Sequence, residues 1–130
     1  MHRSRLAARI ALAVCSSSLL ASCGAPSPAE PLPPPVEATT IKITASGAFP
    51  RNIQVQAGQR VLFINEDSRS HNMTSDPHPE HDACPDINQV GFLLPGDRRE
   101  TGNMVTIQIC GFHDHDSPDV QNLHGQIIIK

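Results

Sequence analysis

Residues 104–115 read MVTIQICGFHDH, and they carry the clearest fold signal in the chain. Val105, Ile107 and Ile109 alternate with polar residues, and this period of two is typical of a β-strand with one buried face. The pattern predicts a strand over Met104–Cys110. That strand runs directly into a histidine-rich turn, so its end is a candidate for chemistry as well as for structure.

Further strands are predicted where β-branched and apolar residues gather between Gly, Pro, Asn and Asp. These runs are Thr40–Thr44, Asn52–Gln56, Arg60–Asn65 and Gly125–Lys130. Some of them alternate, and others are continuously apolar, as interior strands of a sandwich are. Gly58 and Gly96 lie where hairpin turns are expected, and no stretch has the apolar periodicity of a helix. The sequence therefore predicts an all-β fold, a small antiparallel β-sandwich.

Composition limits what the chain can be. At 130 residues it forms one domain at most, and 38% hydrophobic residues with four Phe and no Trp or Tyr predict an aliphatic core. Arg3, Arg5 and Arg9 lie at the N-terminus, so the rest of the chain has seven basic against thirteen acidic residues. This acidic balance argues against nucleic acid as a partner. Four Cys and seven His indicate disulfide or metal chemistry.

The N-terminus has the features of a secretory signal. The three arginines precede a short apolar run, which is too short to span a bilayer, and small residues follow it. Leu20-Ala21-Ser22-Cys23 resembles a bacterial lipobox, so residues 1–22 are expected to be a signal peptide and Cys23 the lipidated first residue of the mature protein. A plain signal peptide is the alternative. Gly24 after the cysteine favours the outer membrane over inner-membrane retention. We therefore expect a lipid-anchored protein of the bacterial cell envelope, on its periplasmic or extracellular face.

A proline-rich segment follows the expected anchor. Residues 23–37 hold six of the twelve prolines and almost nothing apolar, so they are expected to form an extended tether. The folded domain is then residues 38–130. A core of that size is small, so a disulfide or a metal could contribute to its stability.

Candidate metal ligands lie in two segments of this domain. The stretch Glu66–Val90 has no strand signal, and a loop of that length is expected to be functional or to be held by a cross-link. It contains His71, His78, His81 and Cys84, while Cys110, His113 and His115 follow the late strand. Imidazole and thiolate together suit copper or zinc and suit magnesium or calcium poorly.

The order of these residues resembles that of the cupredoxins, the blue-copper family of plastocyanin and azurin. The resemblance covers most of residues 41–130. It is carried by Phe49-Pro50, by Val61-x-Phe63-x-Asn65-x-Asp67 followed by His71-Asn72, by Cys110-x-x-His113, and by the strand that begins at Gly125. It implies a Greek-key sandwich with a long ligand-bearing loop.

The resemblance also implies a copper site. His71 would be the first ligand, Cys110 the thiolate and His113 the second imidazole, with Asn72 linking the ligand loops. Leu123 stands where the family has its weak axial Met, which implies a three-coordinate or more oxidising site. His115 would be an extra or alternative ligand, whereas His124 is interpreted as a strand residue. Met104 is expected in the core, and Met73 is a weak axial candidate.

The cysteines leave a second interpretation open. In an oxidising compartment Cys84 and Cys110 would form a disulfide, which closes a loop of about 27 residues and stabilises by roughly 3–4 kcal/mol. Copper would then be held by imidazoles alone, from His71, His113 and His115 with His78 or His81. A cupredoxin fold without metal is the third alternative.

Three functions are consistent with these features. The first is one-electron transfer by a copper-binding envelope lipoprotein with a redox protein partner. The second is copper storage or delivery, with a copper donor or acceptor as partner. The third is a structural role, since fold does not fix function. We do not expect an enzyme, because the sequence has no nucleophile elbow, no paired-carboxylate framework and no phosphate-binding loop.

Overall fold

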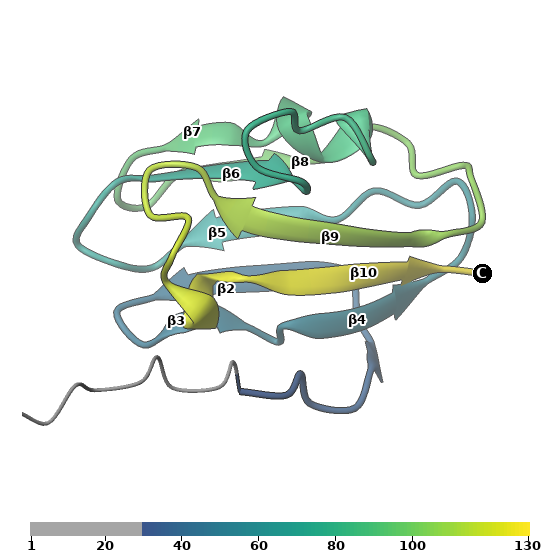
Figure 1. Ribbon diagram of the computed structural model, residues 1–130, viewed down its shortest axis with the longest axis horizontal. Coiled ribbons are helices and arrows are strands. Elements are labelled where there is room, and N and C mark those ends of the chain that lie inside the picture. The colour runs from purple at the N-terminus through teal and green to yellow at the C-terminus, as the bar shows by residue number, and fades with distance from the viewer. Residues whose placement is uncertain (1–29) are drawn as a thin grey trace, which may run out of the picture.

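The computed structural model describes residues 30–130, which form ten strands and two short 3-10 helices (Figure 1). The strands are β1 (Val36–Glu37), β2 (Thr40–Thr44), β3 (Gly47–Phe49), β4 (Asn52–Val55), β5 (Leu62–Asn65), β6 (His71–Ser75), β7 (Gly91–Leu93), β8 (Arg98–Glu100), β9 (Ile109–Asp114) and β10 (Gly125–Ile129). The helices are η1 (Pro85–Gln89) and η2 (Gln121–Leu123).

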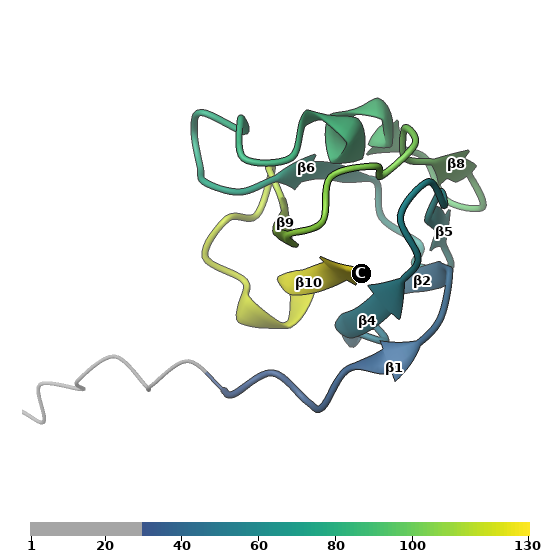
Figure 2. The same ribbon diagram turned by 90° about the vertical axis from the view of Figure 1, so that its right-hand side faces the viewer.

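The strands form two sheets that face each other. One sheet has the order β1-β4-β10-β9-β6-β7, and the other has the order β3-β2-β5-β8. The end-on view shows β2, β5 and β8 on one side of the interior and β6, β9 and β10 on the other (Figure 2). The expected all-β sandwich is confirmed. Its sheets are mixed rather than purely antiparallel, because β1 with β4, β4 with β10 and β2 with β5 pair in parallel.

The core is aliphatic, as the composition predicts. Alternate residues of β2, β4 and β10 point inward, and they include Ile41, Ile43 and Ile127, which are fully buried. Phe63 and Phe112 meet across the two sheets, edge to face, with ring centroids 5.4 Å apart. Their contact joins β5 to the strand that carries the histidine-rich turn.

The predicted turns at Gly58 and Gly96 exist, and both glycines have a positive φ, 91° and 87°. They do not close hairpins, however. Gly58 connects β4 to β5 and Gly96 connects β7 to β8, and each of these pairs is split between the two sheets. Short turns in this chain therefore carry it from one layer of the sandwich to the other.

Two strand predictions need correction. The strand predicted over Met104–Cys110 begins only at Ile109, and it continues to Asp114. Val105 and Ile107 are 63% and 74% exposed, so their alternation does not mark a buried face. Backbone bonds from Gly58 to Met104 and from Met104 to Gln59 hold this segment beside the β4–β5 turn instead.

The second correction concerns the stretch Glu66–Val90, which was expected to lack strands. It contains β6, where His71, Met73 and Ser75 are buried and the two residues between them are partly exposed. The period of two is present, but the buried face has His, Met and Ser in place of β-branched residues. This strand lies between β9 and β7 in the larger sheet.

The expected signal peptide and the lipidated Cys23 lie outside the described residues. Within the expected tether, Val36–Glu37 pairs with β4, and the Asn52 side chain donates a hydrogen bond to the Pro33 carbonyl. The described part of residues 23–37 therefore contacts the sandwich. Between residues 30 and 130, no helix has the length and apolar character needed to cross a membrane.

Candidate metal centre

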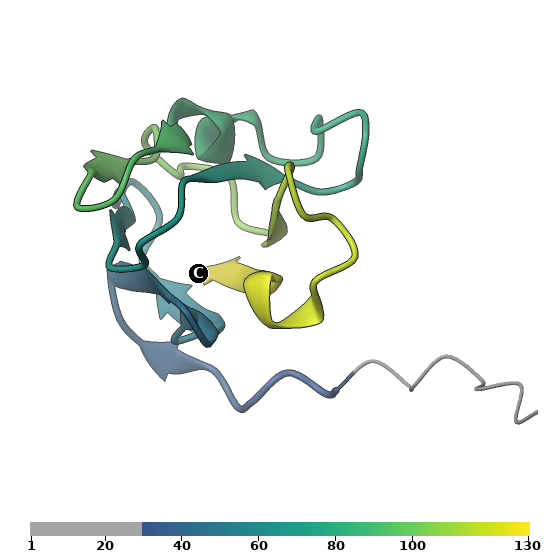
Figure 3. The same ribbon diagram turned by 90° about the vertical axis from the view of Figure 1, so that its left-hand side faces the viewer.

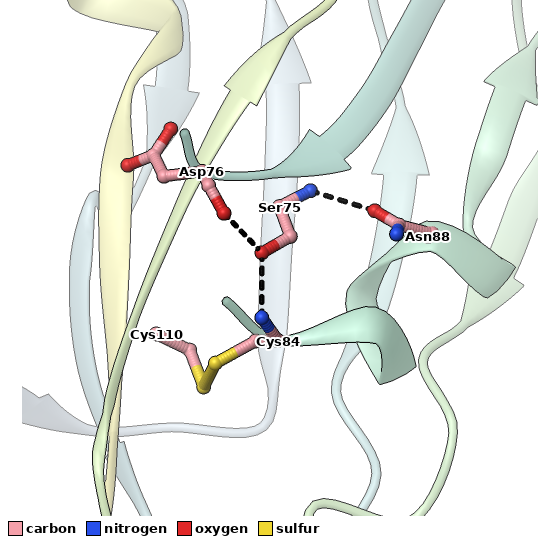
Figure 4. Close-up of a disulfide and its surroundings, with 5 residues drawn as sticks. All are labelled: Ser75, Asp76, Cys84, Asn88 and Cys110. Carbon is pink, nitrogen blue, oxygen red and sulfur yellow. Dashed lines mark hydrogen bonds between the residues drawn. A yellow bond between two sulfur atoms is a disulfide. The ribbon is translucent and has the colours of Figure 1, made fainter. Parts of the chain in front are cut away.

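A disulfide joins the long loop to the late strand. Cys84 and Cys110 are bonded through their sulfurs, with their Cα atoms 5.7 Å apart, and both residues are buried. Around them, the Cys84 amide donates to Ser75 Oγ, which in turn donates to the Asp76 carbonyl (Figure 4). The disulfide therefore fixes the end of the loop 76–84 against β9.

Beside the disulfide, two loops bring four histidines together. The loop after β6 carries His78 and His81, and β9 with the turn after it carries His113 and His115. Figure 3 shows these two loops on the same side of the molecule. Ring centroids of neighbouring histidines lie 4.9–5.5 Å apart. We call these four residues the histidine cluster.

His113 is the buried member of the cluster. Its Nδ1 lies 2.6 Å from Asp76 Oδ1, so Nδ1 is the protonated nitrogen that donates, and Nε2 keeps its lone pair. This Nε2 is buried and has no hydrogen-bond partner among residues 30–130. Burial lowers the pKa of His113 from 6.5, although the Asp76 carboxylate acts in the opposite direction. The ring is therefore neutral at pH 7, with a free nitrogen in the form that binds metal ions.

His81 is held in a similar way. Its Nδ1 lies 2.8 Å from the Ser75 carbonyl oxygen, which fixes the proton on Nδ1 and leaves the lone pair on Nε2. That Nε2 lies 2.9 Å from Nδ1 of His115, which donates to it. The backbone of His81 has φ of 55°, a left-handed conformation uncommon outside glycine. Its amide donates to the Pro77 carbonyl, and its carbonyl accepts from Asn88 Nδ2.

The donor set of the cluster fits a transition-metal ion. One ring nitrogen each from His78, His81 and His113 lies within 4.8 Å of the others, and His78 is exposed. Bonds from zinc to imidazole are about 2.0–2.1 Å, so a bound ion would draw the rings slightly closer. Carboxylate and carbonyl acceptors behind the Nδ1 atoms of His113 and His81 orient the rings, as is usual for histidine ligands. Imidazoles without thiolate suit Cu(II), Zn(II) or Ni(II).

His71, expected as the first ligand, lies in a different site. Its Nδ1 is 2.8 Å from Asp114 Oδ2 and its Nε2 is 3.0 Å from Asp67 Oδ2, and all three side chains are buried. Both nitrogens are therefore used by aspartates, and neither faces the histidine cluster. The His71 hydrogen bond lowers the pKa of Asp67 to about 2 against the opposing effect of burial, with Arg69 and the Ser68 amide contributing.

Cys110, expected as the thiolate ligand, is bonded to Cys84 and presents no thiolate. The carboxylate that meets His71 from β9 belongs to Asp114, four residues further along the strand. Of the two interpretations of the cysteines that the sequence left open, the structure has the Cys84–Cys110 disulfide. His71 was expected among the imidazole ligands, but it is not part of the histidine cluster.

The other expected residues are placed as follows. Asn72 lies on β6, and its backbone contacts the end of β9 and the turn after it, because its carbonyl accepts from the His115 amide and its own amide donates to Asp114. Met73, Met104 and Leu123 are buried in the core. His124 follows η2, and its ring stacks on that of His113 with centroids 5.6 Å apart. His124 was interpreted as a strand residue, and the structure places its ring beside the histidine cluster.

Sequence reasoning missed the groups behind the histidines. Asp76 reaches His113 because Gly111 has no side chain, since a Cβ there would lie 2.0 Å from Asp76 Oδ2. The Asp76 amide also donates to the Gly111 carbonyl. The glycine between Cys110 and Phe112 was a visible signal of such close approach in a strand.

Comparison with solved structures shows what the fold is similar to. The purple cupredoxin from Nitrosopumilus maritimus is 20% identical, with 72% of this chain and 100% of that chain covered and a TM-score of 0.56. Plastocyanin from Dryopteris crassirhizoma is 16% identical over 70% of this chain and 99% of that one, with a TM-score of 0.55. A mutant amicyanin with Cu(I) is 13% identical over 72% of this chain and 82% of that one, with a TM-score of 0.52.

Sequence comparison adds no relative. No protein-family model matches the chain, and no curated protein matches it. The structural likeness agrees with the residue order that first indicated the family, with two mixed sheets and the late strand leading into the histidine-rich turn. The chain has the cupredoxin fold.

Proposed function

We propose that this protein binds copper, as Cu(II), at the histidine cluster. The observation that carries the proposal is the buried Nε2 of His113, which is neutral, unpartnered among residues 30–130 and oriented by Asp76. A buried polar atom without a partner is costly in a folded protein, and a metal ion would give it one. His78 and His81 each supply a further nitrogen within 4.8 Å of a ring nitrogen of His113. A metal ion at His81 Nε2 would replace the hydrogen bond that this atom accepts from His115 Nδ1.

Storage or delivery of copper is the role that this donor set supports best. Electron transfer at blue-copper sites uses a cysteine thiolate, and here the candidate cysteine is in a disulfide. His78 is exposed and sits on a loop, so it can leave the metal and be replaced by a ligand from a copper donor or acceptor. Binding and exchange, rather than catalysis, is therefore the proposed activity.

Titration of the oxidised protein with Cu(II) tests this proposal. We expect one tightly bound ion per chain, an electron paramagnetic resonance spectrum with coupling to imidazole nitrogens, and a pale complex. An intense visible band would require a sulfur ligand and would contradict the all-imidazole site. Absence of tight Cu(II) binding would overturn the proposed function.

Single substitutions locate the ion. His113→Ala should weaken Cu(II) binding most, since it removes the pre-oriented nitrogen, and His81→Ala should also weaken it. His124→Ala is the matched control, because it removes a neighbouring ring whose Nε2 is taken by the Pro118 carbonyl. Equal losses in the control and in His113→Ala would contradict this ligand assignment.

Electron transfer is the second candidate, because the solved structures of similar fold include plastocyanin and an amicyanin with Cu(I). The two roles differ in a measurable way. A carrier should show reversible reduction with the metal retained, whereas a storage site should give up its copper to a competing chelator within seconds to minutes. Slow exchange with a reversible couple would favour the carrier.

We also propose that Cys23 anchors the protein to the cell envelope through a lipid. The lipobox-like run Leu20-Ala21-Ser22 and the proline-rich residues after it support this location. Cys23→Ser should move the protein from the membrane fraction to the soluble fraction, because the lipid is attached through that residue. A Ser variant that stays with the membrane after signal removal would refute the anchor.

A further inference from the structure

The disulfide lies between the two segments that supply the proposed ligands. The loop 76–84 carries His78 and His81 and ends at Cys84. Cys110 stands on β9, three residues before His113 and five before His115. Figure 4 shows the bond between the two sulfurs. This bond is thus a covalent link between the segment that carries His78 and His81 and the segment that carries His113 and His115.

The loop depends on few other attachments to β9. At its start, the Asp76 amide donates to the Gly111 carbonyl, and the Asp76 carboxylate accepts from His113. At its end the attachment is the disulfide. Ser75 connects the two ends, because its Oγ accepts from the Cys84 amide and donates to the Asp76 carbonyl, and its own carbonyl accepts from His81 Nδ1. A shift of Cys84 would therefore reach the groups that orient His81.

We propose that the redox state of the Cys84–Cys110 disulfide controls the metal affinity of the histidine cluster, with the oxidised protein binding more tightly. In the reduction step a dithiol reductant breaks the bond between the two sulfurs. The protein gains two electrons and two protons as two thiols, and the reductant becomes a disulfide. This inference rests on the proposed function, because it concerns regulation of the same site.

The coupling acts in both directions. If oxidation raises metal affinity by some factor, bound metal must favour the disulfide over the dithiol by the same factor. Couplings between sites in one domain are commonly about 5- to 150-fold, and we expect an effect in this range. Both cysteines are buried, so reduction requires local opening of the segment that contains Cys84 and η1. A metal that holds the loop against β9 opposes that opening.

The first experiment compares metal affinity with and without the disulfide. Zn(II) is the probe, since it has no redox chemistry of its own. The Cys84→Ala/Cys110→Ala variant lacks both the bond and any competing thiolate, and circular dichroism verifies its fold. We expect its Kd for Zn(II) to be about 5- to 150-fold weaker than that of the oxidised wild type. A folded variant with unchanged Kd would overturn the proposal.

A second experiment uses the wild type, so that it does not depend on the folding of the variant. The disulfide is reduced with a water-soluble phosphine, and thiols are counted over time by alkylation, with and without saturating Zn(II). We expect zinc, at a concentration that just saturates the wild type, to slow reduction several-fold in the wild type and to have a much smaller effect in His81→Ala, which binds zinc more weakly. Equal or faster reduction with zinc bound would overturn the proposal.

The two failures are distinguishable. If the oxidised wild type binds neither Cu(II) nor Zn(II), the proposed function fails and the regulation fails with it. If the oxidised wild type binds the metal but the disulfide makes no difference to either measurement, only the regulation is wrong. If the reduced wild type bound zinc more tightly than the oxidised wild type, the thiols would be acting as ligands. This result would also refute the proposal.

Discussion

At the scale of single residues, the orientation of His113 depends on a glycine. Gly111→Ala places a Cβ 2.0 Å from Asp76 Oδ2 and 3.2 Å from Asp76 Cβ, so the carboxylate has to leave its position beside the ring. Losing an acceptor behind a ligand histidine commonly costs 10- to 100-fold in metal affinity. We expect a loss of about this size in Kd, measured by titration with Cu(II) or Zn(II). Asp76→Ala should give a similar loss, and unchanged affinity in both variants would show that the Asp76 contact is not needed.

The lowered pKa of Asp67 predicts how the stability of the fold depends on pH. Its folded pKa of about 2 lies below the ordinary value of 3.8, because the carboxylate accepts hydrogen bonds from His71 and Arg69. A depressed carboxyl pKa contributes stability above the unfolded pKa, and this contribution is lost as pH falls from about 4 to about 2. The denaturant concentration at the unfolding midpoint should therefore decrease as the pH is lowered from about 4 to about 2. This decrease should be smaller in Asp67→Asn. An equal slope in both proteins would contradict the assigned role of Asp67.

Individual residues also show what sequence reasoning could and could not provide. It identified the two segments that hold His78, His81, His113 and the cysteines, because rare residue types gather there. It could not separate His71 from these histidines, since the partner that occupies its Nδ1, Asp114, stands 43 residues away in the chain. Which imidazole is free to bind metal is decided by such long-range hydrogen bonds.

At the scale of elements, β6 shows how a strand can be missed. Its inward face has a histidine, a methionine and a serine instead of β-branched residues. His71 links this strand to Asp114 on β9, and both side chains are buried. The pattern of burial is that of a strand, and only the chemistry of the buried side chains is unusual.

Removal of His71 should therefore destabilise the fold. His71→Leu leaves the buried Asp114 carboxylate without its imidazole partner, and loss of one member of a buried pair commonly costs about 3–5 kcal/mol. We expect a loss of this order in the free energy of unfolding, measured with denaturant. His124→Leu is the matched control, since its ring nitrogen bonds a loop carbonyl, and it should cost much less. Similar losses in the two variants would argue against the special role of the β6–β9 contact.

The segment before β9 shows the opposite error, because an alternating pattern there does not predict burial. Ile107 is 74% exposed, so Ile107→Ser should change the free energy of unfolding by less than about 0.5 kcal/mol. Ile127 pairs with Cys110 and is fully buried, so Ile127→Ala should cost about 2–5 kcal/mol. Denaturant unfolding of both variants tests the contrast. A large loss of stability in Ile107→Ser would mean that the side chain of Ile107 is buried in solution.

At the scale of the whole molecule, the sandwich positions the site through connections that the sequence only partly indicated. The fold class followed from strand periodicity and residue order, because a two-sheet sandwich needs only alternating or apolar runs separated by turns. The layering did not follow, since turns such as those at Gly58 and Gly96 cross between sheets. The candidate metal centre therefore lies where the loop after β6 meets the turn after β9, and this contact depends on the neighbouring positions of β9 and β6 in the sheet.

This arrangement would make the proposed metal binding a property of the folded chain, because the proposed ligands His78 and His113 are 35 residues apart in sequence and meet only in the native state. An ion that binds the native but not the unfolded state stabilises by about 2.7 kcal/mol when its free concentration is 100 times Kd. Zn(II) at that excess should raise the free energy of unfolding of the oxidised protein by this amount, measured with denaturant at pH 7. His81→Ala, compared at the same zinc concentration, should gain much less, whereas His124→Ala should gain as much as the wild type. If zinc stabilised the three proteins equally, the stabilising ion would have to bind outside the histidine cluster.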